Sequence, residues 1–276
     1  MAVAYVVECL GRSIRKACDL AGLSRPVYRY EPRPDKDVAV RERLRELAQE
    51  RRRFGSPRLH LMLRREGLVV NHKRTERLYR EEGLALRRKR RRKGSSGVRV
   101  EPPAAQRPNE KWAMDFIHDS TADGRRFRAL VVMDEYTREC TVIEVDRSLG
   151  GKRVVSVLDR LAECRCLPET ITTDNGPEFI GKALDEWACR TGVKLHFISP
   201  GKPMENAYAE SLNGRLRDEC LSGNWFLSLA DAREIIEAWR KDYNSARPHS
   251  SLRGLTPQEY AETATGLQLA LVSMSG

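Results

Sequence analysis

The chain has 276 residues, of which 40% are hydrophobic and 32% charged, so it is long enough for two domains or for one domain with an elaborate appendage. No run of 18 apolar residues exists, which excludes a membrane-spanning helix, and we expect a cytoplasmic protein without a signal peptide. The seven cysteines never occur in C-x-x-C spacing, which argues against a disulfide framework and against a zinc knuckle.

Charge is distributed unevenly along the chain. Residues 1–108 contain 29 Lys and Arg against 13 Asp and Glu, a net charge of +16, whereas residues 109–276 contain 21 against 26, a net charge of −5. A basic front half indicates a nucleic-acid-binding module joined to a second domain. A solvated basic surface without a partner is the alternative.

Short helices are expected in the front half. Ser13 can cap a helix that Gly22 ends, and Ser24 can cap the next helix, with Pro26 tolerated in its first turn. Two helices separated by a glycine turn have the spacing of a helix-turn-helix unit.

A second pair of helices follows. An apolar helical face over residues 59–63 ends at Glu66-Gly67, and Asn71 can cap a helix that ends before Gly83. In that helix three side chains can face inward, namely Thr75, Leu78 and Tyr79, and four cover the surface, namely Lys73, Arg74, Arg77 and Arg80. A DNA recognition helix has this pattern, and so does a basic helix of any three-helix bundle.

Seven consecutive cations occupy Arg87–Lys93, and four of them are Arg87, Arg88, Lys89 and Arg90. Such a block repels itself and is typical of a segment that binds phosphates. The sequence GSSG and a proline-containing stretch follow, so we place a linker over residues 94–108.

The back half changes to strand patterns. Asp123-Gly124 predicts a hairpin turn between the first two strands, and Asp134–Thr137 predicts a turn between the next two. Expected strands cover 112–118, 126–133, 140–145, 169–173 and 193–198, and expected helices cover 151–163, 182–190, 206–220 and 230–243. This order predicts an α/β domain in which an antiparallel meander continues by right-handed crossovers into a mixed sheet flanked by helices.

Two carboxylates stand out on these strands. Asp115 lies in the middle of a strand, where a buried carboxylate must be paired, protonated or bound to a cation. Asp174 lies at the carboxyl end of a crossover strand, where ligands gather in parallel sheets. A salt bridge for Asp115 and an Asx-turn for Asp174, in the sequence Asp-Asn-Gly, are the structural alternatives.

A third carboxylate, Glu210, lies on a predicted helix. Asn206, Asn213 or Gly214, and Arg217 share its face at steps of four, three and four residues. An ordinary solvent-facing surface is the alternative. Four other carboxylates near these segments fall at turns or loops and are not candidates: Asp119, Asp134, Asp146 and Glu178.

These carboxylates belong to motifs that resemble a known family. The motifs are FGSPRLHLMLRREGLVVNHKRTERLYREEGL (54–84), WAMDF (112–116), TTDNGPEF (172–179), GKPMENAYAESLNGRLRDEC (201–220) and YNSARPHSSLRGLTPQEY (243–260). Together they resemble the DDE transposases and retroviral integrases of the ribonuclease H-like superfamily, and more closely the OrfB transposases of bacterial insertion sequences.

The resemblance implies a fold and a set of site residues. It implies an α/β ribonuclease H-like catalytic domain, a five-stranded mixed sheet flanked by helices, preceded by an α-helical helix-turn-helix region. It implies a catalytic triad of Asp115, Asp174 and Glu210 that holds two Mg²⁺, with Mn²⁺ able to substitute. Arg217 matches a basic position that contacts DNA, and Asn175 and Asn206 match positions that shape the site.

The implied reaction is metal-dependent cleavage at insertion-sequence ends, followed by strand transfer in which a 3′-OH attacks a phosphodiester. The implied partners are double-stranded DNA, as element ends and target, further copies of this chain, and the product of an upstream reading frame. We expect a nucleoid-associated protein with residues 1–93 binding DNA, 109–265 catalytic and 266–276 a tail.

Rival functions are a ribonuclease H-type hydrolase and a DNA-binding protein without catalysis, from an inactive or incomplete element. For the Tyr243–Pro257 segment the sequence leaves two roles open, packing beneath the active site or phosphate contact by Arg247 or His249.

Overall fold

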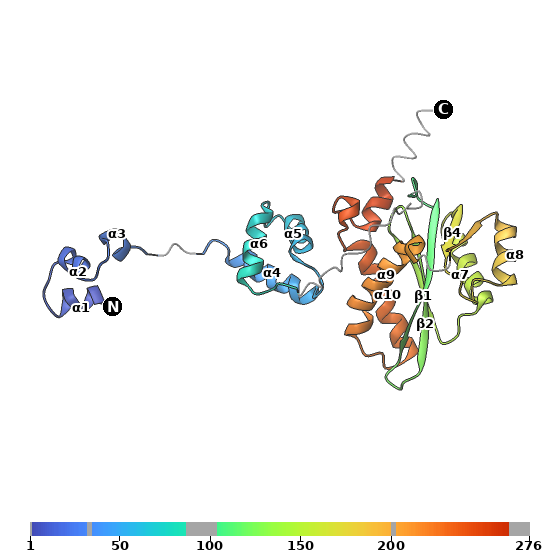
Figure 1. Ribbon diagram of the computed structural model, residues 1–276, viewed down its shortest axis with the longest axis horizontal. Helices are drawn as coiled ribbons and strands as arrows, with labels where there is room; N and C mark the ends of the chain where they lie inside the picture. Colours follow the sequence, from blue (N-terminus) through green and yellow to red (C-terminus); the bar gives the residue numbers. More distant parts are fainter. Residues whose placement is uncertain (1, 32–34, 87–103, 200–202, 265–276) are drawn as a thin grey trace, which may run out of the picture. The chain divides into compact units, whose positions relative to one another are not determined.

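The computed structural model describes residues 2–31, 35–86, 104–199 and 203–264 (Figure 1). The chain divides into two compact units, residues 1–43 and 44–276, and each is described by itself. None of the described helices combines the length and the apolar character needed to cross a membrane.

The first unit contains α1 (Ala2–Glu8), α2 (Ile14–Leu20) and α3 (Arg25–Tyr28). Ser13 caps α2 as expected, because its hydroxyl accepts the Lys16 N–H at 3.5 Å. The turn that follows contains Gly22 at φ +64°, a left-handed conformation that favours glycine. The small core of this first unit consists of Val3, Ala17 and Cys18. Helix α4 (Val38–Glu50) spans the division between the units.

The second unit begins with the rest of α4 and continues with α5 (Ser56–Arg65) and α6 (His72–Glu81). The Asn71 carboxamide accepts the Lys73 N–H at 3.0 Å and so caps α6. The predicted inward face of α6 is confirmed, since Thr75, Leu78 and Tyr79 are all buried. His60 Nδ1 lies 2.9 Å from Thr75 Oγ1 and links α5 to α6.

A five-stranded sheet follows, in the order β3-β2-β1-β4-β5. Its strands are β1 (Lys111–Ser120), β2 (Arg126–Asp134), β3 (Cys140–Asp146), β4 (Thr170–Thr173) and β5 (Lys194–Phe197). Strands β1, β2 and β3 pair antiparallel, whereas β4 and β5 run parallel to β1. The predicted mixed sheet, an antiparallel meander continued by crossovers, is therefore confirmed.

Helices cover both faces of the sheet (Figure 1). On one face α7 (Gly151–Cys164) and α8 (Lys182–Thr191) pack on side chains such as Trp112 and Met114 of β1. On the other face α9 (Ala207–Glu219) and α10 (Leu229–Ser245) pack on side chains such as Ala113 and Ile117. Successive residues of β1 thus serve two separate cores, which is the two-residue period of a strand covered on both sides.

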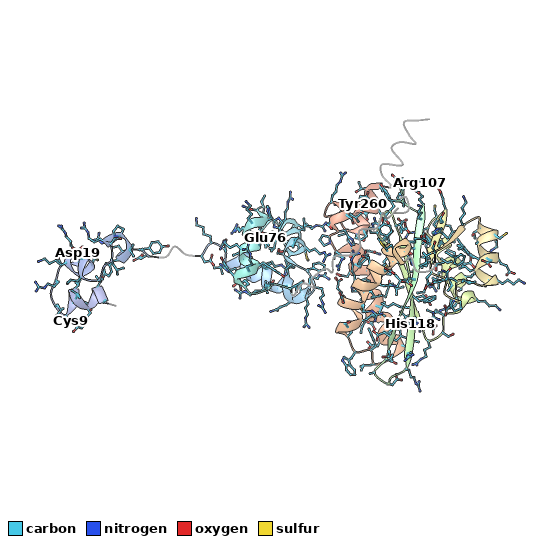
Figure 2. All side chains as sticks on the ribbon, in the orientation of Figure 1. Cys9, Asp19, Glu76, Arg107, His118 and Tyr260 are labelled. Carbon is cyan, nitrogen blue, oxygen red and sulfur yellow. The ribbon has the colours of Figure 1, made fainter. Side chains whose placement is uncertain are left out.

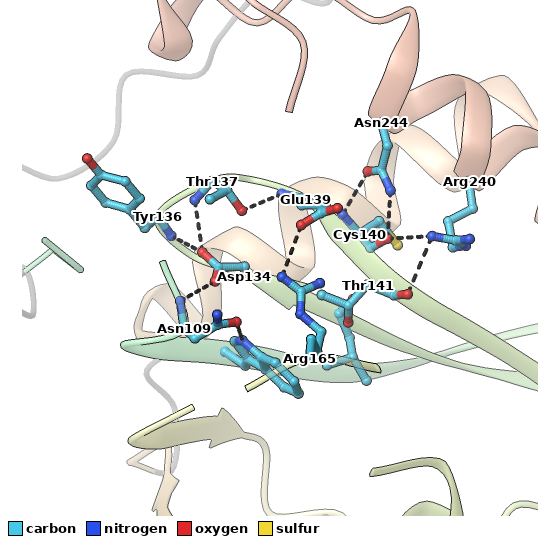
Figure 3. A network of polar contacts seen from close by, with 12 residues as sticks. Asn109, Asp134, Tyr136, Thr137, Glu139, Cys140, Thr141, Arg165, Arg240 and Asn244 are labelled. Carbon is cyan, nitrogen blue, oxygen red and sulfur yellow. Dashed lines mark hydrogen bonds and ion pairs between the residues drawn. The ribbon is translucent and has the colours of Figure 1, made fainter. Parts of the chain in front are cut away.

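The turn between β2 and β3 is built around a buried carboxylate, Asp134. Asp134 accepts backbone N–H groups of Asn109, Tyr136 and Thr137 at 2.7, 2.8 and 2.9 Å (Figure 3). These three donors satisfy the buried carboxyl oxygens. Asp134 therefore organises the turn that was expected over Asp134–Thr137.

The last turn of α10 and the segment that follows it pack on both the sheet and the helical region. Asn244 holds Cys140 at the start of β3 with two hydrogen bonds of 2.9 Å (Figure 3). Farther along, the centre of the Tyr260 ring lies 5.4 Å from that of the Tyr136 ring. Figure 2 labels Tyr260 near one end of the sheet and His118 near the other. Helix α5 reaches this segment through Arg65, which binds Glu259 at 2.7 Å.

Candidate active site

Asp115 lies in the middle of β1, on the face that α9 covers. Its Oδ1 accepts the Phe116 N–H at 2.8 Å, and its Oδ2 accepts Asn213 Nδ2 at 2.8 Å. Burial raises the pKa of Asp115 to about 6, and the nearby carboxylates of Asp174 and Glu210 add to the rise, against the two hydrogen bonds, which lower it. Asp115 is thus a half-buried carboxylate close to like charges, and it forms no ion pair with a cation among the described residues.

Asp174 follows directly after β4. The parallel register pairs Ala113 with Thr172, and two further residues on each strand bring Asp115 level with Asp174. Asp174 Oδ1 accepts the Gly176 N–H at 3.0 Å, so the predicted turn does form. A Cβ at Gly176 would lie 3.0 Å from that oxygen, a tight approach that would press on the carboxylate.

The same turn is attached to β5. Asn175 Nδ2 donates to the backbone oxygen of Ile198 at 2.8 Å, which fixes the turn against the residue that follows β5. Asn175 therefore shapes the end of the sheet from which Asp174 projects.

Glu210 is exposed in the first turn of α9. Two asparagines attach this helix to β1 on either side of it: Asn206 Nδ2 donates to the Met114 carbonyl at 3.1 Å, and Asn213 donates to Asp115. The helix expected over 206–220 forms as α9, Ala207–Glu219, and a 3₁₀ helix that was not expected, η1 (Pro203–Asn206), precedes it. Glu210 is thereby placed close enough to Asp115 to influence its pKa.

Asn213 has a structural role that the sequence pattern does not indicate. The helical pattern predicts that Asn213 lies on the polar face of Glu210, whereas its side chain is buried, with 9% of its surface exposed. The only sequence signal is its position three residues after Glu210 and seven after Asn206, which indicates a shared face but not a bond to β1.

The predicted DNA-binding residues lie elsewhere. Arg217 is exposed on α9, two turns after Glu210. On α6, Lys73 and Arg77 are exposed, Arg74 is half-buried, and Arg77 pairs with Glu81 at 3.0 Å. The predicted contacts at Arg87, Arg88, Lys89 and Arg90 lie outside the described residues.

The arrangement fits a divalent cation that accepts oxygen ligands. Asp115, Asp174 and Glu210 offer only carboxylate oxygens, the donors that Mg²⁺ and Mn²⁺ prefer. Within the described ranges no group of three His, Cys, Asp or Glu side chains is gathered closely enough to hold a metal ion. Mg²⁺ commonly binds through one or two carboxylates and keeps waters or takes substrate oxygens as its further ligands.

Comparisons with known proteins agree with this architecture. An HTH-like domain matches residues 35–92, and two integrase core domain models match 105–203 and 191–257. The 31.7 kDa protein of insertion element IS407 from Burkholderia multivorans is 51% identical over 92% of each chain. The chain belongs to the integrase-core transposases of insertion sequences.

More distant similarities agree with that assignment. The putative transposase InsK of insertion sequence element IS150 from Escherichia coli is 28% identical, over 83% of this chain and 84% of its own. A chain of the simian T-cell lymphotropic virus intasome has a TM-score of 0.53 at 15% identity, covering 79% of the transposase and 74% of that chain. This last similarity shows a shared fold.

We expect Asn213→Ala to weaken divalent-metal binding by the transposase. Loss of the 2.8 Å bond leaves only the Phe116 N–H to orient Asp115, and loss of a group that orients a metal ligand typically costs about 10–100-fold in metal affinity. Calorimetric titration with Mn²⁺ measures the effect. Asn224→Ala, beyond the far end of the same helix, is the control, and equal Mn²⁺ affinity in the two variants would contradict the prediction.

Of the two roles left open for the Tyr243–Pro257 segment, packing is the one that the structure displays. Arg247 is buried and paired with Glu219 of α9, and its guanidinium lies 5.8 Å from the centre of the Tyr243 ring. The buried His249 meets the same ring edge-on at 5.1 Å. The segment therefore supports α9 from the side that lies away from Glu210.

Burial lowers the pKa of His249 to about 3, and the positive charges of Arg215, Arg247, Arg58 and Arg138 contribute to the shift. The unfolded chain binds a proton at this residue below about pH 6.5, whereas the folded chain does not. We therefore expect His249 to cost the transposase about 2 kcal/mol of stability between pH 7 and pH 5.

Urea unfolding of wild type and His249→Asn at both pH values measures this linkage. The variant should lose less stability than wild type on acidification, whatever its stability at pH 7. His118→Asn, which removes an exposed histidine, is the control and should leave the pH dependence unchanged. Parallel pH curves for wild type and His249→Asn would show that His249 titrates normally in the folded protein.

Proposed function

We propose that the transposase cleaves DNA at the ends of its insertion sequence and joins the freed ends to DNA, with Asp115, Asp174 and Glu210 as its metal ligands. The observation that carries the proposal is the position of Asp115, a half-buried carboxylate in mid-strand that faces two further carboxylates instead of a cation. A cluster of like charge is unfavourable unless a cation compensates it.

The residues of the site hold the carboxylates in place. The Phe116 N–H and Asn213 fix the two oxygens of Asp115, the Gly176 N–H fixes Asp174, and the attachment of Asn206 and Asn213 to β1 positions Glu210. Divalent ions bound there would activate the attacking oxygen and stabilise the leaving oxygen.

No side chain needs to act as a nucleophile in this reaction. In the first step a water oxygen bonds to phosphorus while the bond to the 3′ oxygen breaks, which leaves a 3′-OH and a 5′-phosphate. In the second step that 3′-OH attacks another phosphodiester, with loss of its proton to solvent and release of a new 3′-OH. The first step replaces a phosphate ester bond by a P–OH group, and the second step replaces one phosphate ester bond by another.

We further propose that residues 1–93 bind double-stranded DNA and that residues 109–265 catalyse, with 94–108 as the linker. The exposed cations of α6 support this division, as does the match of an HTH-like domain to residues 35–92. Two element ends must be held together in transposition, so several copies of the chain, with or without an upstream reading-frame product, would act on DNA.

The test uses the DNA that flanks the gene as substrate, with Mg²⁺ or Mn²⁺, and compares wild type with Glu210→Gln. We expect metal-dependent nicking and strand joining by wild type and neither by the variant. Hydrolysis without joining would indicate that the protein acts as a nuclease and not by strand transfer. Specific end binding without cleavage by either protein would favour the DNA-binding function without catalysis.

A further inference from the structure

A group of basic side chains lies where the helical region meets α9 and the segment after α10. We call Arg58, Arg215, Arg247 and His249 the arginine cluster. Arg58 comes from the first turn of α5, Arg215 from α9, and the other two from the motif that follows α10. The transposase active site uses none of them.

Aromatic rings hold the guanidinium groups of the cluster in place. Arg58 and Arg247 both lie over the ring of Phe54, at 5.4 and 5.1 Å from its centre. Arg215 donates to the Tyr243 hydroxyl at 3.3 Å, and the ring of that tyrosine also contacts Arg247 and His249. Stacking positions a guanidinium but leaves most of its N–H groups available for an anion.

The cluster has a large excess of positive charge. Glu219, which pairs with Arg247, is the one carboxylate that contacts it among the described residues. Arg58 has no side-chain hydrogen bond or ion pair within the described ranges, and Arg215 has only its bond to the Tyr243 hydroxyl. Both are half-buried, so their mutual repulsion is screened less than at an open surface.

Two buried polar atoms of the cluster, Arg247 Nε and His249 Nε2, have no hydrogen-bond partner among the described residues. Arg247 and His249 are only 3% and 5% exposed, so a DNA phosphate would contact Arg58 and Arg215 and not these two atoms. Half-buried guanidiniums that aromatic contacts hold in place are suited to bind a phosphate group at the surface.

We propose that the arginine cluster is a seat for a phosphate of the DNA backbone, separate from the phosphodiester that is cut. Arg215 lies five residues after Glu210 on α9, which places the two on different sides of the helix. A phosphate bound at the cluster is therefore a different phosphate from the one at the carboxylates. The seat lies beside the first turn of α5 and anchors a duplex segment next to the helical region.

This inference rests on the proposed function, because it takes DNA as the substrate. The test measures binding of a fluorescent DNA duplex to the full chain in EDTA, over a series of salt concentrations, without any reaction. Arg58→Gln combined with Arg215→Gln should lower affinity roughly tenfold and reduce the slope of log affinity against log salt by about two, one for each lost contact.

Two controls separate a lost contact from a damaged fold. Arg190→Gln removes an arginine of α8 that already pairs with Asp159 of α7 and should leave the salt slope unchanged. Arg58→Lys combined with Arg215→Lys keeps both charges and should retain most of the slope. Thermal melting of each variant in chloride shows whether it folds. The shift in melting temperature between chloride and phosphate, at equal ionic strength, shows whether it binds free phosphate.

The outcomes decide between the occupants. A slope reduced only by the glutamine variant supports a DNA phosphate at the cluster. An unchanged slope, with wild type binding DNA normally, overturns the seat but leaves the proposed function intact. Stabilisation by free phosphate that only the glutamine variant loses, with no change in DNA binding, overturns DNA as the occupant. A wild-type chain that binds no DNA overturns both proposals.

Discussion

Asp115→Asn, Asp174→Asn and Glu210→Gln are each expected to lower the rate of strand joining by at least about 10²–10³-fold, the usual effect of removing one preorganised charge from an active site. Each substitution keeps the size of the side chain and removes one negative charge, so metal binding is lost while packing is kept. Combining two of them should cost little more than one, because groups that act as a unit are not additive.

The measurement is single-turnover joining of a pre-nicked element end, together with Mn²⁺ titration of each variant. Asp146→Asn is the matched control, since Asp146 is a carboxylate of the same sheet that pairs with Arg233 at 3.2 Å instead of facing the triad. If a triad variant retained wild-type Mn²⁺ affinity and joining, the substituted residue would not belong to the active site.

Arg247→Leu is expected to destabilise the protein by about 3–5 kcal/mol, the second large effect. The substitution leaves Glu219 as a poorly hydrated carboxylate without its partner, because the Arg247 and Glu219 side chains are only 3% and 14% exposed. It also removes the guanidinium that stacks on Phe54 and Tyr243. The loss should therefore exceed that of any exposed ion pair of the same fold.

Urea unfolding of Arg247→Leu, Glu219→Leu and the double variant separates charge from packing. The double variant should recover much of the loss, because no unpaired charge remains in it. The exposed pair of Arg190 and Asp159 is the control, and Arg190→Leu should cost no more than about 1 kcal/mol. If the double variant lost as much free energy of unfolding as the two single variants together, packing and not charge would dominate.

Much of the sheet could be predicted because its strands carry their own local signals. The alternation along β1 and the turn chemistry at Asp123-Gly124 and Asp174–Gly176 depend on neighbours in sequence, and these elements form within two residues of the expected bounds. Asp115 could be singled out because a carboxylate in an apolar strand conflicts with its surroundings. Such a conflict is visible without knowing the fold.

The bonds that hold the site could not be predicted, because they join residues far apart in sequence. Asn213 and Asp115 are separated by 98 residues, and nothing local distinguishes this asparagine from a solvated one. The 3₁₀ helix before α9 was missed for the same reason. Asn206 there binds the backbone of β1 instead of continuing the helix pattern, with φ −115° and ψ 31°.

The outer edge of the sheet has a consequence for how copies of the transposase can assemble. Strand β3 lies at one end of the strand order, and side chains of α10 bond to backbone groups near both of its ends: Asn244 binds the N–H and the carbonyl of Cys140, and Arg233 binds the Val145 carbonyl at 2.8 Å. A helix that covers an edge strand in this way hinders the addition of a further strand. Two sheets that joined through β3 would have to break these bonds, which favours other surfaces for an assembly that brings two DNA ends together.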